Sequence, residues 1–184
     1  MFKILSVVST ILFLSSCQVP KVALFSVNDY KNVQPYSVAV GAIEVQDETT
    51  RYTELPHIET RIPITPAKAL SQALSNRFRV AFPASSAQLN MIIHDASLTQ
   101  ESIQSDKWYI LDNIEYTLTY QLDVMYQNSE MKTENQSISG WEKQALPKRS
   151  SLADKEQVWQ KMIDAMTQKV TDKIYADMPQ EYKR

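Results

Sequence analysis

The sequence predicts an α+β domain in which an antiparallel or mixed sheet of about four strands carries two helices packed on one face. Three patterns support this fold class. Apolar and polar residues alternate along 114–126, as in a strand with one buried face. Residues 65–82 and 152–178 repeat apolar residues at three- and four-residue steps, as amphipathic helices do. Residues 37–45 and 89–98 have the composition of further strands.

The first half of the domain reads as strand, loop and helix. The run SVAVGAIEV at 37–45 predicts a buried strand, in which Gly41 marks a bulge or a close backbone approach. Residues 46–64 predict a loop, and loops of this length are often functional. Thr65 followed by proline predicts a helix start, and Pro83 predicts its end.

The second half reads as three strands and a helix. The run at 89–98 follows strand and helix at a spacing that suggests a crossover connection. A turn at Asn128-Ser129 would lead into 131–146, whose polar character predicts an edge strand. Ser151 and Asp154 resemble a capping box at the start of the last helix. One face of that helix is expected to be core: Trp159, Met162, Ile163, Met166, Val170, Ile174 and Met178.

The first seventeen residues have the form of a secretory signal peptide with a lipidation box. Lys3 precedes the apolar run Ile4–Leu14, and Ser15-Ser16 precede Cys17. Eleven apolar residues are too few to cross a bilayer, which takes about 20. The box resembles that of bacterial lipoproteins, and this resemblance implies cleavage before Cys17 and attachment of acyl chains of the palmitate type to that residue.

Three segments follow from this interpretation. Residues 1–16 are the cleaved signal peptide, 17–36 the lipidated tether, and 37–184 a single α+β domain facing the periplasm. Within the tether, residues 22–27 are apolar enough to add a strand to the domain edge. In enteric lipoproteins an aspartate after the lipidated cysteine retains the protein at the inner membrane. This chain has Gln18 at that position, so the resemblance implies that it is located at the outer membrane.

Composition excludes several functional classes. The chain has 19 Lys and Arg against 21 Asp and Glu, with no basic cluster longer than a pair, so a nucleic-acid partner is not expected. With 2 glycines it contains no glycine-rich phosphate loop or dinucleotide turn, so no nucleotide cofactor is expected. Cys17 is the 1 cysteine, which leaves a mature domain without disulfides. His57 and His94 lack the spacing of metal ligands, and we expect no metal.

No catalytic set assembles from the sequence. His94 and Asp95 lie in a predicted strand and would point to opposite faces, so they would not form a dyad. The carboxylates Glu44, Asp47 and Glu48 are expected to be a solvated loop end. Aromatic residues either pack across strands or line a groove for a sugar or lipid chain, the packing being favoured: Trp108, Tyr109, Tyr116, Tyr120, Tyr126 and Trp141.

Four segments carry a wider resemblance. VAVGAIEVQDE, RIPITPAKALSQAL, IIHDASL and the terminal helix with Trp159 together resemble uncharacterised proteobacterial lipoproteins. The order of elements is more loosely similar to that of auxiliary lipoproteins of envelope ABC transport and lipid-trafficking systems. The chain departs from that second family in lacking its basic-tryptophan signature at the first helix, and Cys17 is the residue that carries over.

The sequence therefore predicts a lipid-anchored, non-enzymatic binding or accessory domain, with an envelope protein as partner and 46–64 as the contact surface. Two alternatives remain open. One is an envelope hydrolase acting on peptidoglycan or lipid through His94 or His57 and a nearby acid. The other is a purely structural envelope lipoprotein.

Overall fold

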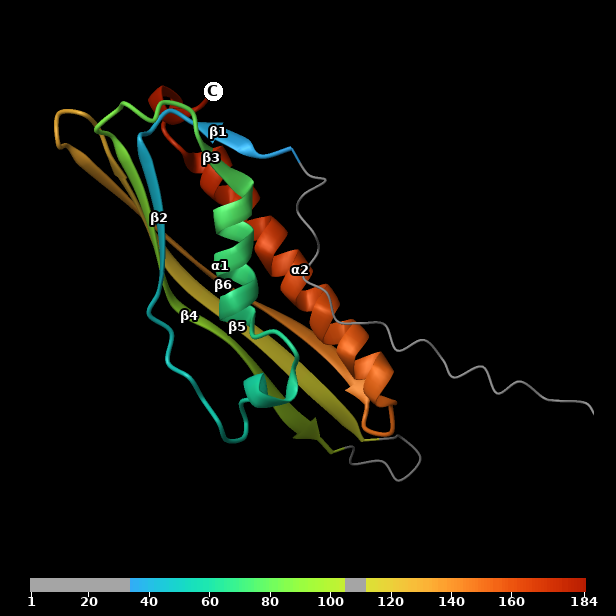
Figure 1. The fold of residues 1–184 in the computed structure, drawn as a ribbon. Coiled ribbons are helices and arrows are strands. Elements are labelled where there is room, and N and C mark those ends of the chain that lie inside the picture. Colours follow the sequence, from blue (N-terminus) through green and yellow to red (C-terminus); the bar gives the residue numbers. More distant parts are fainter. Residues whose placement is uncertain (1–33, 105–111) are drawn as a thin grey trace, which may run out of the picture.

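The computed structural model describes residues 34–104 and 112–184, which form two helices packed on a sheet (Figure 1). The predicted signal peptide, Cys17 and residues 22–27 lie outside the described residues. The elements, in chain order, are β1 (Tyr36–Val38), β2 (Ala42–Asp47), η2 (Glu59–Arg61), α1 (Pro66–Arg77), β3 (Phe78–Val80), β4 (Gln88–Ile103), β5 (Asn113–Gln127), β6 (Thr133–Pro147), α2 (Leu152–Asp177) and η3 (Gln180–Tyr182).

The main sheet has four strands in the order β2-β4-β5-β6. β2 and β4 run parallel and are joined through α1, whereas β4, β5 and β6 form antiparallel ladders. Both helices lie on one face of this sheet, α1 over β2 and β4 and α2 over β5 and β6 (Figure 1). The predicted mixed sheet with two helices on one face is confirmed.

The alternation along β5 has the predicted effect. Its apolar side chains, from Ile114 to Tyr126, are buried beneath the helices, and the polar residues between them lie on the opposite, open face of the sheet. β6 ends the strand order, so the predicted polar edge strand is also confirmed. The turn before it is longer than the sequence suggested: Asn128 Oδ1 accepts hydrogen bonds from the amides of Glu130 and Lys132.

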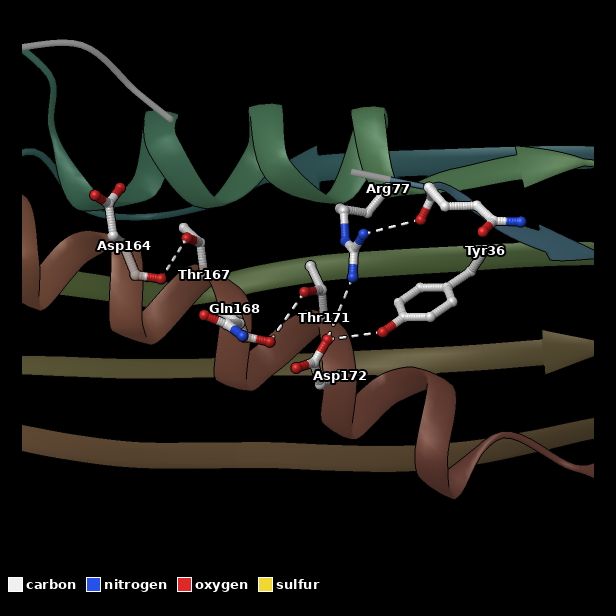
Figure 2. A network of polar contacts seen from close by, with 8 residues as sticks. Tyr36, Arg77, Asp164, Thr167, Gln168, Thr171 and Asp172 are labelled. Carbon is white, nitrogen blue, oxygen red and sulfur yellow. Dashed lines mark hydrogen bonds and ion pairs between the residues drawn. The ribbon is translucent and has the colours of Figure 1, made fainter. Parts of the chain in front are cut away.

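α2 supplies the predicted apolar face. Ser151 and Asp154 form the capping box in both directions, which satisfies two amides at the helix start. All seven residues predicted as core are buried. Thr167 and Thr171 also face the interior, and each hydroxyl donates to a backbone carbonyl one turn earlier (Figure 2). The core therefore admits two hydroxyls without leaving them unpaired.

The predicted strand at 37–45 is wrong as a single element. β1 pairs with β3 in a second, two-stranded sheet, and β2 joins the main sheet. The change of sheet occurs at Gly41, where a Cβ atom would lie 1.8 Å from the carbonyl oxygen of Ser85. Gly41 thus marks the close backbone approach that the sequence suggested, and the approach separates the two strands.

The first helix is shorter than predicted. The apolar periodicity runs on to Phe82, but α1 ends at Arg77 and the next three residues form β3. Pairing with β1 explains this change: the ladder joins Tyr36 to Phe78 and Val38 to Val80. A long-range strand partner overrides the local helical pattern, which the sequence alone does not reveal.

A polar cluster fixes the N-terminal end of the described domain to both helices (Figure 2). Arg77 is 7% exposed; its guanidinium donates to the carbonyl of Gln34 at 2.9 Å, lies 3.4 Å from Asp172 Oδ1 and sits 4.5 Å from the centre of the Tyr36 ring. The Tyr36 hydroxyl donates to the same carboxylate oxygen at 2.7 Å, and its ring stacks on Tyr175. The chain therefore enters the domain at a fixed point beside α2.

Within 34–104 and 112–184, no helix combines the length and the apolar composition that a bilayer crossing requires.

Candidate functional site

A cavity lies where β2 leaves its neighbour. The parallel ladder between β2 and β4 ends at Asp47 and Ile93, and the chain then swings away from the sheet. It returns at 56–59 and pairs with the vacated edge of β4: Ile58 N donates to Leu98 O at 3.0 Å, and Leu98 N donates to Glu59 Oε1 at 2.8 Å. The departing and returning segments, together with the start of α1, enclose the cavity.

The predicted loop 46–64 is therefore two different pieces. Its second part is docked, because Ile58 and Ile62 are buried in the core. Its first part projects from the molecule, and Leu55, near its end, is 59% exposed. This projecting part and the cavity lie at one end of α1, and the entry point of the chain beside Arg77 lies at the other (Figure 1).

The cavity has a volume of about 550 Å³, is half open to solvent, and has mixed walls in which apolar surface exceeds polar surface. Its floor is Ala96 of β4, on the helix-facing side of the sheet. The remaining lining comes from the loop and from the first two turns of α1: Asp47, Thr49, Thr50, Arg51, Tyr52, Thr53, Glu59, Thr60, Pro63, Thr65, Ala67, Lys68, Ser71 and Gln72. Thr65 is also the N-cap of α1, its hydroxyl accepting from Lys68 N at 3.3 Å.

His57 and Glu59 form the inner support of the loop. His57 Nδ1 lies 3.4 Å from Glu59 Oε1, and the imidazole stacks on the Tyr52 ring at 3.8 Å between centres. Glu59 Oε1 accepts from β4, whereas Glu59 Oε2 and His57 Nδ1 are buried without a hydrogen-bond partner among the described residues. A buried acceptor without a hydrogen-bond partner lowers the stability of the fold, so Glu59 Oε2 could still accept a hydrogen bond there.

A second polar group of residues lies on the open face of the sheet. His94 Nε2 is 3.0 Å from Asp123 Oδ2, the Ser137 hydroxyl donates to Asp123 Oδ1 at 2.6 Å, and His94 Nδ1 is 3.6 Å from Glu48 Oε2. The hydrogen bond from Ser137, followed by that from His94, holds the pKa of Asp123 below its usual value.

The prediction that His94 and Asp95 point to opposite faces is wrong. The β4–β5 register shifts between Ile93 and Asp95, which marks a bulge at His94. His94 contacts Asp123 and Asp95 accepts from Thr119, and both of these partners lie on the open face of β5. The two neighbours therefore share a face, although each binds a different residue.

The acids near the two histidines are now identified, Asp123 for His94 and Glu59 for His57. The arrangement around His94 differs from a nucleophile triad, because the Ser137 hydroxyl donates to the acid rather than to the imidazole. Among the described residues, no group of three or more His, Cys, Asp or Glu is placed to hold a metal ion.

The aromatic residues divide between the two faces of the sheet. Tyr116, Tyr120 and Tyr126 are buried under the helices, and Tyr116 meets Trp159 edge-on at 5.6 Å. Trp141, 64% exposed, pairs with Thr119 on the open face. These residues do not share a groove, and cross-sheet packing explains the tyrosines. Trp108 and Tyr109 lie outside the described residues, as does the lipid-attachment residue Cys17.

The sequence located the region of the cavity but not its residues. The length of the loop pointed to 46–64, yet Tyr52, Lys68 and Gln72 were not singled out. Threonines recur through this stretch, and that is the signal that was available. The spacing of these threonines does not show which of them line the cavity, because the lining is brought together by the return of the loop to β4.

No protein-family model matches the chain, and no curated protein matches it. Several solved structures are similar in part. An uncharacterised lipoprotein B from Nitrosomonas europaea has 14% identity and a TM-score of 0.47 over 81% of this chain and 91% of that one. A minor lipoprotein from Acinetobacter baumannii has 12% identity and a TM-score of 0.40 over 76% and 94%. The rare lipoprotein B from Shewanella oneidensis has 17% identity and a TM-score of 0.36 over 72% and 94%. The predicted resemblance to proteobacterial lipoproteins recurs among these chains.

Proposed function

We propose that this protein is a lipid-anchored lipoprotein of the bacterial envelope that acts as a non-enzymatic binding or accessory component. Acylated Cys17 would hold it on a membrane, the outer membrane by the Gln18 rule, with the domain facing the periplasm. A single acyl chain binds membranes marginally, whereas two or more anchor a protein stably. The assembly it would serve is one of transport or lipid trafficking.

The observation that carries the proposal is that the entry point of the chain and the cavity lie at opposite ends of α1. The chain enters beside Arg77, at the C-terminal end of the helix, and the cavity lies at the N-terminal end, about 18 Å away at 1.5 Å per residue. An anchor attached before Gln34 thus leaves the projecting part of the loop directed away from the attachment point (Figure 1). A partner could contact Leu55 without competing with the membrane.

Two measurements test the anchor. Labelling of growing cells with a radioactive fatty acid is expected to mark the wild-type protein and not a Cys17→Ser variant, and that variant is expected to leave the membrane pellet. An unlabelled wild-type protein, or a variant that stays in the pellet, would overturn the anchor and with it the proposed localisation.

The partner contact is tested by crosslinking in cells. A photo-reactive residue in place of Leu55 is expected to capture an envelope protein. The matched control is Leu152, which is 63% exposed against 59% for Leu55 and starts α2 instead of lying in the loop. Equal capture from both positions, or none from Leu55, would remove the loop as the contact surface.

The non-enzymatic part of the proposal has its own test. His57→Ala and His94→Ala variants would abolish function if either imidazole were a general base of a hydrolase. We expect both variants to keep the fold and to complement a deletion strain for envelope integrity. Loss of complementation by a folded His94→Ala variant would instead favour a hydrolase that acts on peptidoglycan or lipid.

A further inference from the structure

The cavity behind the loop is a half-open pocket with the volume of a ligand site. Ligand sites typically measure about 300–1,000 Å³, and this pocket measures about 550 Å³. It is also built by a specific device, the departure and return of the chain between Asp47 and Glu59, and not by loose packing of the helices.

The walls are rich in hydrogen-bonding groups and balanced in charge. Asp47 and Glu59 supply two carboxylates, and Arg51 and Lys68 supply two cations. Apolar surface comes from Pro63, Ala67 and Ala96 and from the carbon atoms of the polar side chains, and it is the larger share of the lining. Six of the lining residues carry a hydroxyl group: Thr49, Thr50, Thr53, Thr60, Thr65 and Ser71. Hydroxyls donate and accept equally well, so such a surface matches a ligand that does the same and bears no net charge.

Glu59 identifies the missing partner as a donor. Its Oε1 is used by Leu98 N, and its Oε2 is buried with no partner among the described residues. Because Oε2 is shielded from solvent as it stands, the carboxylate would have to turn on ligand binding while one oxygen keeps the bond from Leu98 N. A ligand hydroxyl would then supply the missing donor. A bond to an ionised acceptor is stronger than one between neutral groups, so this contact would add both affinity and orientation.

Tyr52 adds an aromatic wall. One face of its ring is stacked on His57, with an angle of 12° between the planes, and the residue remains 41% exposed. A fixed ring of this kind offers an apolar surface beside polar groups, which suits a molecule with C–H bonds on one face and hydroxyls around its edge.

From these features we propose that the cavity binds a saccharide unit, an uncharged and hydroxyl-rich ring that stacks on Tyr52 and donates a hydroxyl to Glu59. Gln72, which projects from α1, would bind a further hydroxyl. The competing occupant is a phosphate-type anion held by Arg51 and Lys68. The two carboxylates would repel such an anion, and for that reason the neutral ligand is favoured. This inference goes beyond the proposed function, because it concerns the domain whether or not Cys17 is acylated.

The test measures binding by saturation-transfer NMR on the purified full-length protein, in lauryldimethylamine oxide micelles because this detergent has no sugar headgroup. The probes are methyl glucoside, N-acetylglucosamine and its β-1,4-linked disaccharide, with glycerol phosphate and inorganic phosphate as the anion arm. At least one neutral saccharide is expected to receive saturation.

Two variants assign the binding to this cavity. Glu59→Gln keeps an acceptor for Leu98 N but loses the second carboxylate oxygen, and Gln72→Ala removes an exposed side chain from a helix. Each is expected to weaken saccharide binding roughly five- to tenfold, the loss of one hydrogen bond. The matched control is Gln168→Ala, the same change on an exposed position of α2, which should leave binding unchanged. Circular dichroism confirms that each variant is folded.

Three outcomes would overturn the proposal: no saturation of any neutral saccharide, binding that neither cavity variant weakens, or binding confined to the phosphates and lost in Lys68→Gln. The last result would assign the cavity to an anion. None of these outcomes bears on fatty-acid labelling at Cys17 or on crosslinking at Leu55, so this inference and the proposed function fail separately.

Discussion

Gly41→Ala should be one of the most damaging single substitutions in this domain. The added Cβ atom would lie 1.8 Å from the carbonyl oxygen of Ser85 and 2.8 Å from its carbonyl carbon, whereas real Cβ contacts essentially never fall below 3.0 Å. The two backbones would have to separate by about 1.2 Å at this point. Because the clash is with backbone, no change of rotamer relieves it.

The surrounding hydrogen bonds resist that separation. Gly41 N donates to Ala87 O at 2.8 Å, Phe82 N donates to Val40 O at 3.3 Å, and Ser85 N donates to Phe82 O at 2.9 Å. Moving the segments apart would lengthen the first two bonds and open the core around Val40, which is fully buried. Overpacking with lost hydrogen bonds costs about 2–4 kcal/mol. For a domain of this size that amounts to a fall in Tm of about 4–16 °C.

The assay is urea unfolding followed by tryptophan fluorescence, since Trp159 is buried in the core. Gly140→Ala is the comparison: its Cβ would meet the Tyr120 hydroxyl at 2.4 Å and the adjoining ring carbon at 2.6 Å. Tyr120 is buried, so its ring must shift within the core, but a side chain can shift without separating two backbones, and a smaller cost of about 1 kcal/mol is expected. The reasoning is refuted if Gly41→Ala unfolds within about 0.5 kcal/mol of the wild type, or costs no more than Gly140→Ala.

Three further predictions concern stability. Met131 has a φ of 64°, so Met131→Gly should raise the free energy of unfolding by about 0.5–1 kcal/mol and with it the urea midpoint; a lower midpoint would contradict the backbone assignment. Arg77→Ala should lower the free energy of unfolding by about 2–3 kcal/mol and Asp172→Ala by about 1 kcal/mol or less, because Arg77 is buried whereas Asp172 is 47% exposed. Equal losses would mean that the ion pair between the two side chains is the main contribution. Burial raises the pKa of the Tyr126 hydroxyl, so the wild type should keep its stability below pH 10 and lose it as the pH rises above that value. Tyr126→Phe should lose less stability than the wild type between about pH 8 and about pH 11, and parallel curves would exclude this group as the cause.

The sequence was most informative where local pattern and tertiary partner agree. β5 alternates without interruption, and α2 combines a capping box with an apolar face, so both were predicted almost to the residue. It was least informative where a distant segment decides. β3 follows a helical pattern but becomes a strand because β1 pairs with it, and the bulge at His94 reverses the expected side-chain direction.

The candidate site shows the same division. Loop length indicated the region, but the cavity exists because 56–59 returns to the edge of β4, a contact between segments about forty residues apart in sequence. Glu59 carries no sequence mark that separates it from other loop carboxylates. Its unpaired oxygen becomes visible only when the hydrogen bonds around it are known.

The corner where the chain enters the domain also holds its end (Figure 1). Val38 of β1 forms a bridge with Lys183, and Ala39 N donates to Tyr182 O at 2.9 Å. Tension applied to the chain before Gln34 would therefore be carried by β1 in shear, against β3 on one side and the last residues on the other. The hydrogen bonds between β1 and its parallel neighbour β3 would then be loaded together and not one by one, so a domain attached through this corner would resist pulling better than one attached through an unpaired terminus.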